Sequence, residues 1–195
     1  MAWGFFGEEH VELTDVEKDI GARIGERDVD VYATGVMSNI YRVASMMRNH
    51  MEREILVDDG LSFTAFIVMF TLWVWGDMES QRLAGKAGVT KGTLTGVVKT
   101  LERRGLCVRG GSAEDRRRVI VSLTENGANV VQKLAPLYNR EESRLVDGLS
   151  LENQLLVANS LRAVLKTGSK LKAGSKSGRY RGSGESDSRL QEPGA

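Results

Sequence analysis

The chain has 195 residues, enough for one folded domain with extensions, and 41% of them are hydrophobic, which suffices for a core. The formal net charge is only +1, so any affinity for a polyanion must come from charge clustered on one face. A single cysteine excludes an intramolecular disulfide. Residues 1–10 lack the charged and apolar parts of a secretory signal, and the apolar run 63–75 is too short to cross a bilayer. We therefore expect a cytoplasmic protein.

The first half of the chain reads as helices. Residues 1–30 form an extension with one short helix, since Thr14 and Glu17 have the spacing of a capping box. A longer helix is expected from Asp30 to about Leu56, ended by the sequence VDDG at 57–60. One face of this helix is apolar at helical spacing: Val36, Ile40, Val43, Met47 and Met51.

The next helix is expected to start after Ser62, a good N-cap, and to end near Gly76. Asp77 is then expected to cap a short helix that ends at Gly88. A tight turn follows, and Thr90 is the expected N-cap of a further helix over about residues 91–104. A helix presented after such a turn can enter the major groove of DNA.

The helix over 91–104 has two faces. Its apolar positions share one side: Leu94, Val97, Val98 and Leu101. Its polar positions face solvent, mostly in the N-terminal half that reaches base edges in recognition helices: Lys91, Thr93, Thr95 and Lys99. An ordinary amphipathic surface helix would show the same pattern, so this helix alone does not decide between the two interpretations.

A β-hairpin with an arginine-rich loop follows. Leu106 and Val108 alternate with Cys107 and Arg109, and a second alternating run covers 118–123. Three consecutive arginines lie near the loop tip: Arg116, Arg117 and Arg118. The loop is either merely solvated or a wing that inserts arginine into a minor groove and contacts phosphates. Asp115 is close enough in sequence to pair with Arg117 and hold the loop.

The remainder is helical and then irregular. Thr124 is expected to cap a long helix to about Val146, with Pro136 inside it, and Ser150 to cap a final helix to about Lys166. The tail 167–195 is rich in Gly, Ser, Lys and Arg, and we expect it to be disordered. It would serve either as a basic arm on phosphates or only as a solubilising tail.

Residues 31–166 resemble the MarR family of winged helix-turn-helix transcription regulators. The most specific parts are LAGKAGVTKGTLTGVVKTLERRGLCVR and EDRRRVIVSLTENG. Asp115, Arg116 and Arg117 match the wing motif of the family, as do Leu123, Thr124 and Gly127 of its L-T-x-x-G motif. Ser112 and Ala113 depart from it. The expected fold is mainly α with a small β-hairpin wing.

The resemblance also implies an architecture and a mechanism. Residues 61–124 would form the winged DNA-binding domain, and 31–60 with 125–166 a helical dimerisation region. A homodimer would place two recognition helices in successive major grooves of a near-palindromic operator. A small aromatic or phenolic acid would enter a crevice lined by six candidates: Arg42, Met46, His50, Phe66, Phe70 and Trp73. Core packing is the alternative for the aromatic residues, and a surface ion pair for Arg42.

We therefore interpret the sequence as a ligand-relieved repressor without a cofactor. The alternatives are a DNA-binding regulator without a ligand, acting as activator or architectural protein, and a redox-responsive regulator using Cys107. Neither G-x-x-x-x-G-K-[ST] nor G-x-S-x-G occurs, and two distant histidines with one cysteine make no catalytic dyad, so we do not expect an enzyme. Only His10 and His50 exist, which disfavours a transition-metal site.

Overall fold

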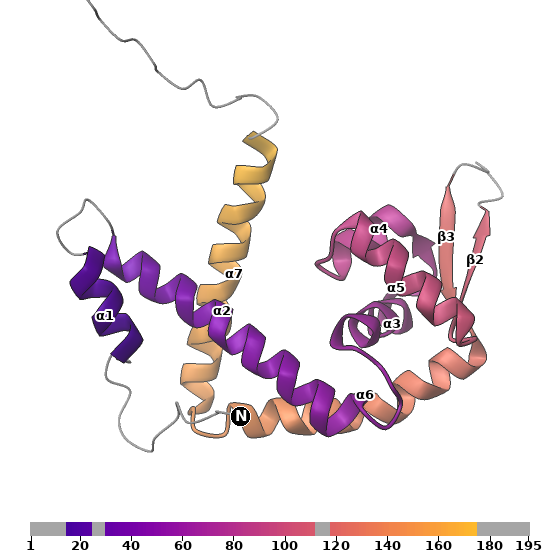
Figure 1. The fold of residues 1–195 in the computed structure, drawn as a ribbon, viewed down its shortest axis with the longest axis horizontal. Coiled ribbons are helices and arrows are strands. Elements are labelled where there is room, and N and C mark those ends of the chain that lie inside the picture. The colour runs from indigo at the N-terminus through magenta and orange to yellow at the C-terminus, as the bar shows by residue number, and fades with distance from the viewer. Residues whose placement is uncertain (1–14, 25–29, 112–117, 175–195) are drawn as a thin grey trace, which may run out of the picture. The chain divides into compact units, whose positions relative to one another are not determined.

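The computed structural model describes residues 15–24, 30–111 and 118–174 (Figure 1). The chain divides into two compact units, 1–141 and 142–195. The described part is mostly helical with one small antiparallel sheet, which confirms the expected fold class. No described helix is both long and apolar enough to span a bilayer.

The first unit begins with α1 (Asp15–Ile24) and α2 (Val31–Met51). Helix α2 starts where expected, and Asp30 caps it, because its carboxylate accepts the backbone N–H groups of Tyr32 and Ala33 at 3.0 Å. The helix continues into one π-helical turn, η1 (Glu52–Leu56), so the expected end at Leu56 is confirmed, although the last turn is wider than an α-helix.

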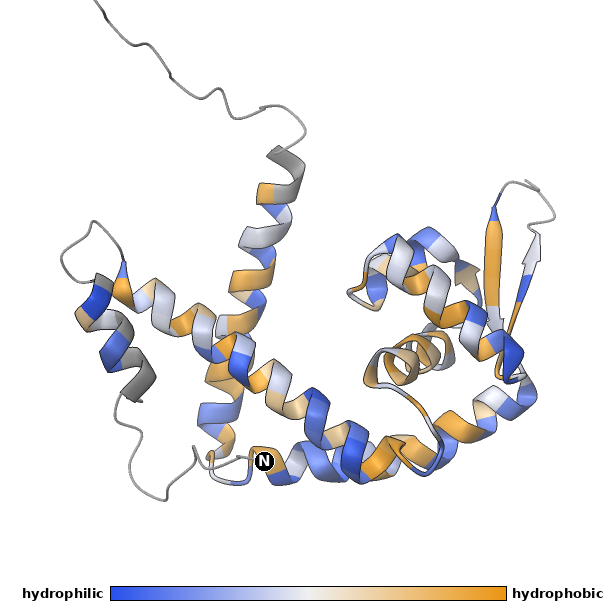
Figure 2. Ribbon diagram, in the orientation of Figure 1, coloured by the Kyte–Doolittle hydropathy of each residue, from blue (hydrophilic) through white to orange (hydrophobic). Residues whose placement is uncertain are grey.

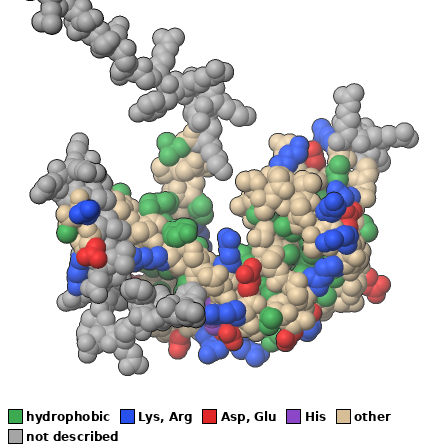
Figure 3. Space-filling model, viewed as in Figure 1, with side chains coloured by type: hydrophobic (Ala, Val, Ile, Leu, Met, Phe, Trp, Pro, Cys, Tyr) green, Lys and Arg blue, Asp and Glu red, His purple; other side chains and the backbone are tan. Residues whose placement is uncertain are grey.

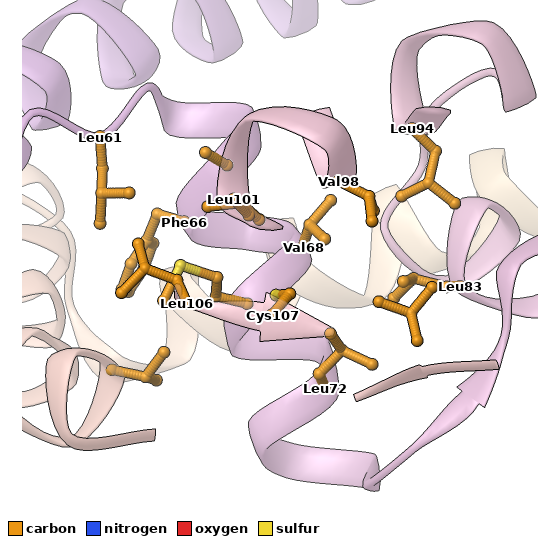
Figure 4. Close-up of a cluster of buried hydrophobic side chains, with 14 of the residues drawn as sticks. Leu61, Phe66, Val68, Leu72, Leu83, Leu94, Val98, Leu101, Leu106 and Cys107 are labelled. Carbon is orange, nitrogen blue, oxygen red and sulfur yellow. The ribbon is translucent and has the colours of Figure 1, made fainter. Parts of the chain in front are cut away.

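Helix α3 (Phe63–Trp75) lies at the centre of the hydrophobic core (Figure 2). Ser62 caps it by accepting the Ala65 N–H at 3.2 Å. Side chains from α3 meet apolar side chains of α4, α5 and the start of β2 (Figure 4). Among these, Leu83, Leu101 and Val68 are completely buried, so the short helices are held by packing rather than by their own propensity.

A short strand, which was not predicted from the sequence, precedes the helix-turn-helix. Residues Met78–Glu79 form β1, and Met78 pairs with Val121 and Glu79 with Ile120 of β3. Because β1 is extended, α4 (Ser80–Lys86) starts only after it. The expectation that Asp77 caps this helix was therefore wrong; the N-cap residue is Glu79, without a side-chain cap bond.

Helix α5 (Lys91–Arg103) follows the turn and precedes the two long strands of the sheet. Strands β2 (Cys107–Gly111) and β3 (Val119–Leu123) pair antiparallel, in the sheet order β1-β3-β2. Cys107, opposite Leu123, points into the core, whereas Val108 is 50% exposed. In β2, the side chain of Cys107 therefore faces the core, and the side chain of Val108 faces solvent.

Two long helices complete the chain: α6 (Glu125–Leu145), which contains Pro136, and α7 (Leu151–Gly174). Thr124 accepts the N–H of Gly127, and Ser150 that of Asn153, so both expected caps are confirmed. The expectation of disorder from 167 was wrong for 167–174, which extend α7. Extending an existing helix is much easier than nucleating one, so a polar segment can follow on. Residues 175–195 lie outside the described part.

Candidate nucleic-acid interface

The structure confirms the two faces of α5. Leu94, Val98 and Leu101 are buried, and the predicted polar residues are exposed: Lys91, Thr93, Thr95 and Lys99. We call these four residues the α5 face. Thr90 caps the helix, because its Oγ1 accepts the Thr93 N–H at 3.1 Å.

The threonine hydroxyls of the α5 face are already engaged within the helix. Thr95 Oγ1 donates to the Lys91 carbonyl oxygen at 2.9 Å, and Thr93 Oγ1 lies 2.9 Å from Thr90 Oγ1. Lys91 and Lys99 therefore supply the long polar groups of this face. The threonines offer methyl groups and the remaining lone pairs of their oxygens.

A hollow of about 390 Å³ joins the α5 face to the sheet. Its walls are Lys91, Leu94, Thr95 and Val98 of α5, the segment Glu79–Gln81, Arg109 of β2, Val119 of β3, and Arg118 directly before β3. Three of these side chains are cationic and one is a carboxylate. Figure 3 shows Lys and Arg side chains gathered over α5 and the sheet. Positive charge concentrated beside an exposed helix suits a phosphate backbone.

Polar contacts connect both long strands to neighbouring elements. Glu102 of α5 accepts the backbone N–H of Arg109 at 3.1 Å and pairs with its guanidinium at 2.5 Å. These contacts, the side-chain hydrogen bond first, hold the pKa of Glu102 below its ordinary value. Arg118, directly before β3, lies 3.8 Å from Glu79 of β1, and the Val119 carbonyl of β3 accepts a hydrogen bond from the Ser80 hydroxyl of α4 at 3.1 Å. The base of the wing is therefore fixed relative to α4 and α5.

The predicted tip of the wing, with Asp115, Arg116 and Arg117, lies outside the described residues. Arg118, the residue before β3, is described and exposed. It shares the hollow with Lys91 and Arg109. The structure thus brings one predicted wing arginine next to the α5 face.

The six candidates for ligand binding lie on α2 and α3. Phe66 is only 1% exposed and stacks on Tyr138 of α6 with ring centroids 4.8 Å apart, so it belongs to the core. Phe70 is half-buried and lies 6.0 Å from Trp73, which is 45% exposed. His50 Nε2 lies 2.8 Å from Glu141 Oε2. Arg42 and Met46 are half-buried, and none of the six lines the hollow described above.

Sequence reasoning missed the three carboxylates that pair with His50, Arg109 and Arg118. Glu141 is 8% exposed and continues the apolar stripe of α6 formed by Val131, Leu134 and Tyr138. A carboxylate at a core-facing position was the signal that could have found it. Glu79 and Glu102 had no such signal, because exposed carboxylates on helices and in turns are common and only the fold gives them arginine partners.

Cys107 gives no support to the redox alternative. Its side chain is 1% exposed, and burial, aided by the charge of Glu102, raises the pKa of its thiol to about 12. At neutral pH it is a protonated, enclosed thiol, whereas a reactive cysteine is accessible and ionised. Among the described residues, no three His, Cys, Asp or Glu side chains converge as metal ligands would.

Known proteins share both the sequence and the fold. Residues 61–119 match the MarR family. YwaE of Bacillus subtilis, an uncharacterized HTH-type transcriptional regulator, is 33% identical over 159 residues, spanning 80% of this chain and 93% of YwaE. Sco3205 of Streptomyces coelicolor, solved in complex with DNA, has a TM-score of 0.66 at 23% identity, over 72% of this chain and 90% of its own.

A further solved structure concerns regulation of the DNA binding of Bordetella bronchiseptica BpsR by 6-hydroxynicotinic acid. Its TM-score is 0.60 at 22% identity, over 66% of this chain and 97% of its own. The family match and the relatives, together with the fold, identify a DNA-binding transcriptional regulator of the winged helix-turn-helix class rather than an enzyme. The chain belongs to the MarR family.

Proposed function

We propose that the protein is a homodimeric repressor that binds a near-palindromic operator and releases it when a small aromatic or phenolic acid binds. The observation that carries the DNA-binding part is the exposed polar face of α5 beside a hollow that holds Lys91, Arg109 and Arg118. A helix of this kind enters a major groove, while cations around it contact phosphates.

We assign the DNA contacts as follows. Thr90 positions the first turn of α5; the residues that face the major groove and its phosphates are Lys91, Thr93, Thr95 and Lys99. In the wing, Arg116 enters the minor groove, Asp115 orients Arg117, and Arg118 contacts phosphate. These roles use the preference of arginine for narrow minor grooves and for phosphate oxygens.

The dimer is inferred from apolar side chains that stay in solvent. On α2, Tyr32 is 86% and Tyr41 73% exposed. On α7, Leu151 is 72% and Leu165 73% exposed. Exposed apolar faces of this extent mark interfaces. We propose that 31–60 and 125–166 form the dimerisation region, which holds two winged domains (61–124) so that their α5 helices are about 34 Å apart.

The effector site is proposed around Phe70 and Trp73. An aromatic ring could stack on these two side chains, with Phe66 packed beneath Phe70 at 5.8 Å. Arg42 would pair with the carboxylate, and Met46 and His50 would complete the wall. The proposal is supported by BpsR, a protein of similar fold whose DNA binding is regulated by 6-hydroxynicotinic acid.

The test is fluorescence anisotropy with a duplex from the region upstream of the gene, against a random duplex of equal length. We expect specific binding with a steep salt dependence. Lys91→Ala should weaken it and lower the salt slope by about one, whereas Lys18→Ala, on α1, should not. Equal affinity for both duplexes would contradict a specific regulator.

The effector is tested by titrating 6-hydroxynicotinic acid and a series of hydroxybenzoates into the complex. One of them should release the DNA, and Trp73→Phe should raise the concentration needed, while Trp75→Phe, another exposed tryptophan of α3, should not. Specific binding that none of these acids disturbs would support the regulator and reject the ligand. Sedimentation of the free protein should give twice the chain mass.

A further inference from the structure

The hollow beside α5 contains a carboxylate among its cations. Glu79 lines it together with Lys91, Arg109 and Arg118. Glu79 is half-buried, and its backbone position in the wall of the hollow is fixed because it pairs with Ile120 in the sheet. A negative charge at this place is unfavourable for a surface that approaches a polyanion.

Two carboxylates pair with arginines in or next to the long strands, and the geometry of the two pairs differs. Glu102 contacts Arg109 through both the guanidinium and the backbone N–H, at 2.5 and 3.1 Å. Glu79 lies 3.8 Å from Arg118, beyond hydrogen-bonding distance, and the two side chains are 38% and 59% exposed. The first contact anchors a strand, whereas the second is a loose ion pair in which a phosphate oxygen can replace the carboxylate.

We propose that Glu79 is a specificity-determining residue of the DNA interface: its carboxylate competes with phosphate for Arg118 and so suppresses binding to non-cognate duplexes. The inference rests on the proposed placement of DNA against α5 and the hollow. A duplex that engages Arg118 leaves Glu79 beside phosphates, without its partner. Non-cognate DNA, bound through charge alone, has no base contacts that offset this cost.

The salt dependence should carry a signature of this competition. When phosphate displaces Glu79, the carboxylate takes up a cation from solution, which cancels part of the counterion release from DNA. Removing the carboxylate should therefore both tighten binding and steepen the salt slope. A merely structural role of Glu79 would not steepen the slope. Its side chain makes no cap bond to α4, so replacing it should preserve the fold.

The experiment measures binding of full-length protein to a random-sequence 30-bp duplex over a range of salt concentrations. We expect Glu79→Gln to bind about fivefold more tightly, with a salt slope steeper by about one. Glu79→Ala should do the same. Glu54→Gln, which removes an exposed carboxylate from η1, is the matched control and should leave both quantities unchanged. Thermal melts of each variant check folding.

A double-mutant cycle with Arg118→Ala separates competition from simple charge removal. The gain from Glu79→Gln should disappear in the Arg118→Ala background. A gain that persists there, or wild-type affinity in Glu79→Gln, would overturn the proposal. If either outcome occurs while the wild type still binds the duplex and Lys91→Ala still weakens this binding, only the role of Glu79 is rejected. If the wild type shows no salt-dependent binding, the proposed interface itself fails.

Discussion

Arg104 Nη1 donates a hydrogen bond to the carbonyl oxygen of Gly60 at 2.8 Å, although the two residues are 44 positions apart. Its other terminal nitrogen donates to the carbonyl of Asp59, and the Asp59 carboxylate lies 2.9 Å from Lys133 Nζ. The loop that joins η1 to α3 is thus bound to the C-terminal end of α5 and to α6. The backbone of Gly60, at φ +56°, allows the sharp turn that exposes both carbonyls.

We expect Arg104→Ala to lower the free energy of unfolding by about 1 kcal/mol, because two carbonyl groups lose a charged donor but stay accessible to water. Urea denaturation measures the change. Arg103→Ala, at the neighbouring exposed arginine, serves as the control and should have a smaller effect. Equal effects of the two variants would show that the contacts to the loop add nothing to stability.

Gly127 has no room for a side chain. A Cβ atom there would lie 2.0 Å from the carbonyl oxygen of Leu106 and 3.1 Å from Leu123 Cδ2. Because the nearest atom belongs to the backbone, a rotamer change cannot relieve the clash, and α6 would have to move away from the sheet. We expect Gly127→Ala to cost about 3 kcal/mol or more, seen as a large drop in melting temperature.

The matched control for Gly127→Ala is Gly148→Ala, since a Cβ at Gly148 meets nothing within 4 Å. That variant should melt close to the wild type. A Gly127→Ala protein that melts like Gly148→Ala would mean that α6 does not pack as closely on Leu106 as described. The contact also gives a physical reason for the glycine of the L-T-x-x-G motif.

Local sequence patterns predicted most of the fold, because each helix cap or apolar stripe depends on residues that are close together in the sequence. The caps at Ser62, Thr90 and Thr124 depend on hydrogen bonds that span three positions, so they can be predicted from the sequence. Strand β1 could not be seen, because Met78–Glu79 has no pattern of its own and becomes a strand only by pairing with β3.

The candidate site likewise has features that the local sequence predicts and features that depend on the fold. The exposed side of α5 follows from its helical period, which also identified the buried leucines. The pairs Glu102–Arg109 and Glu79–Arg118 require α5, β1 and the sheet to be placed in space, which no local pattern specifies. Phe66 showed the opposite difficulty: an aromatic residue on α3 fits a ligand site or a core equally well, and only its 1% exposure places it in the core.

Cys107 should behave as an inert core residue. Because its thiol is buried and its pKa is raised to about 12, we expect it to react with a thiol reagent such as dithionitrobenzoate only after unfolding. Treatment with hydrogen peroxide should leave DNA binding unchanged. Rapid labelling of the native protein, or loss of DNA binding that a reductant restores, would revive the redox alternative.

The anchor between Glu102 and Arg109 should make stability depend on pH. The hydrogen bond from the Arg109 side chain lowers the pKa of Glu102 in the folded protein below the ordinary value of a glutamate. A group with a lowered folded pKa stabilises the protein above its unfolded pKa, and this contribution is lost as the pH falls through the folded value. Glu102→Gln, which cannot ionise, lacks the contribution at every pH.

The wild type should therefore be more stable than Glu102→Gln at pH 7, and the two should converge as the pH falls through the lowered folded pKa of Glu102. Urea midpoints measured at several pH values give the comparison. Glu125→Gln, at an exposed position of α6, is the matched control for a lost carboxylate. A wild-type advantage that stays constant down to low pH would show that Glu102 stabilises the base of the wing through packing and not through its charge.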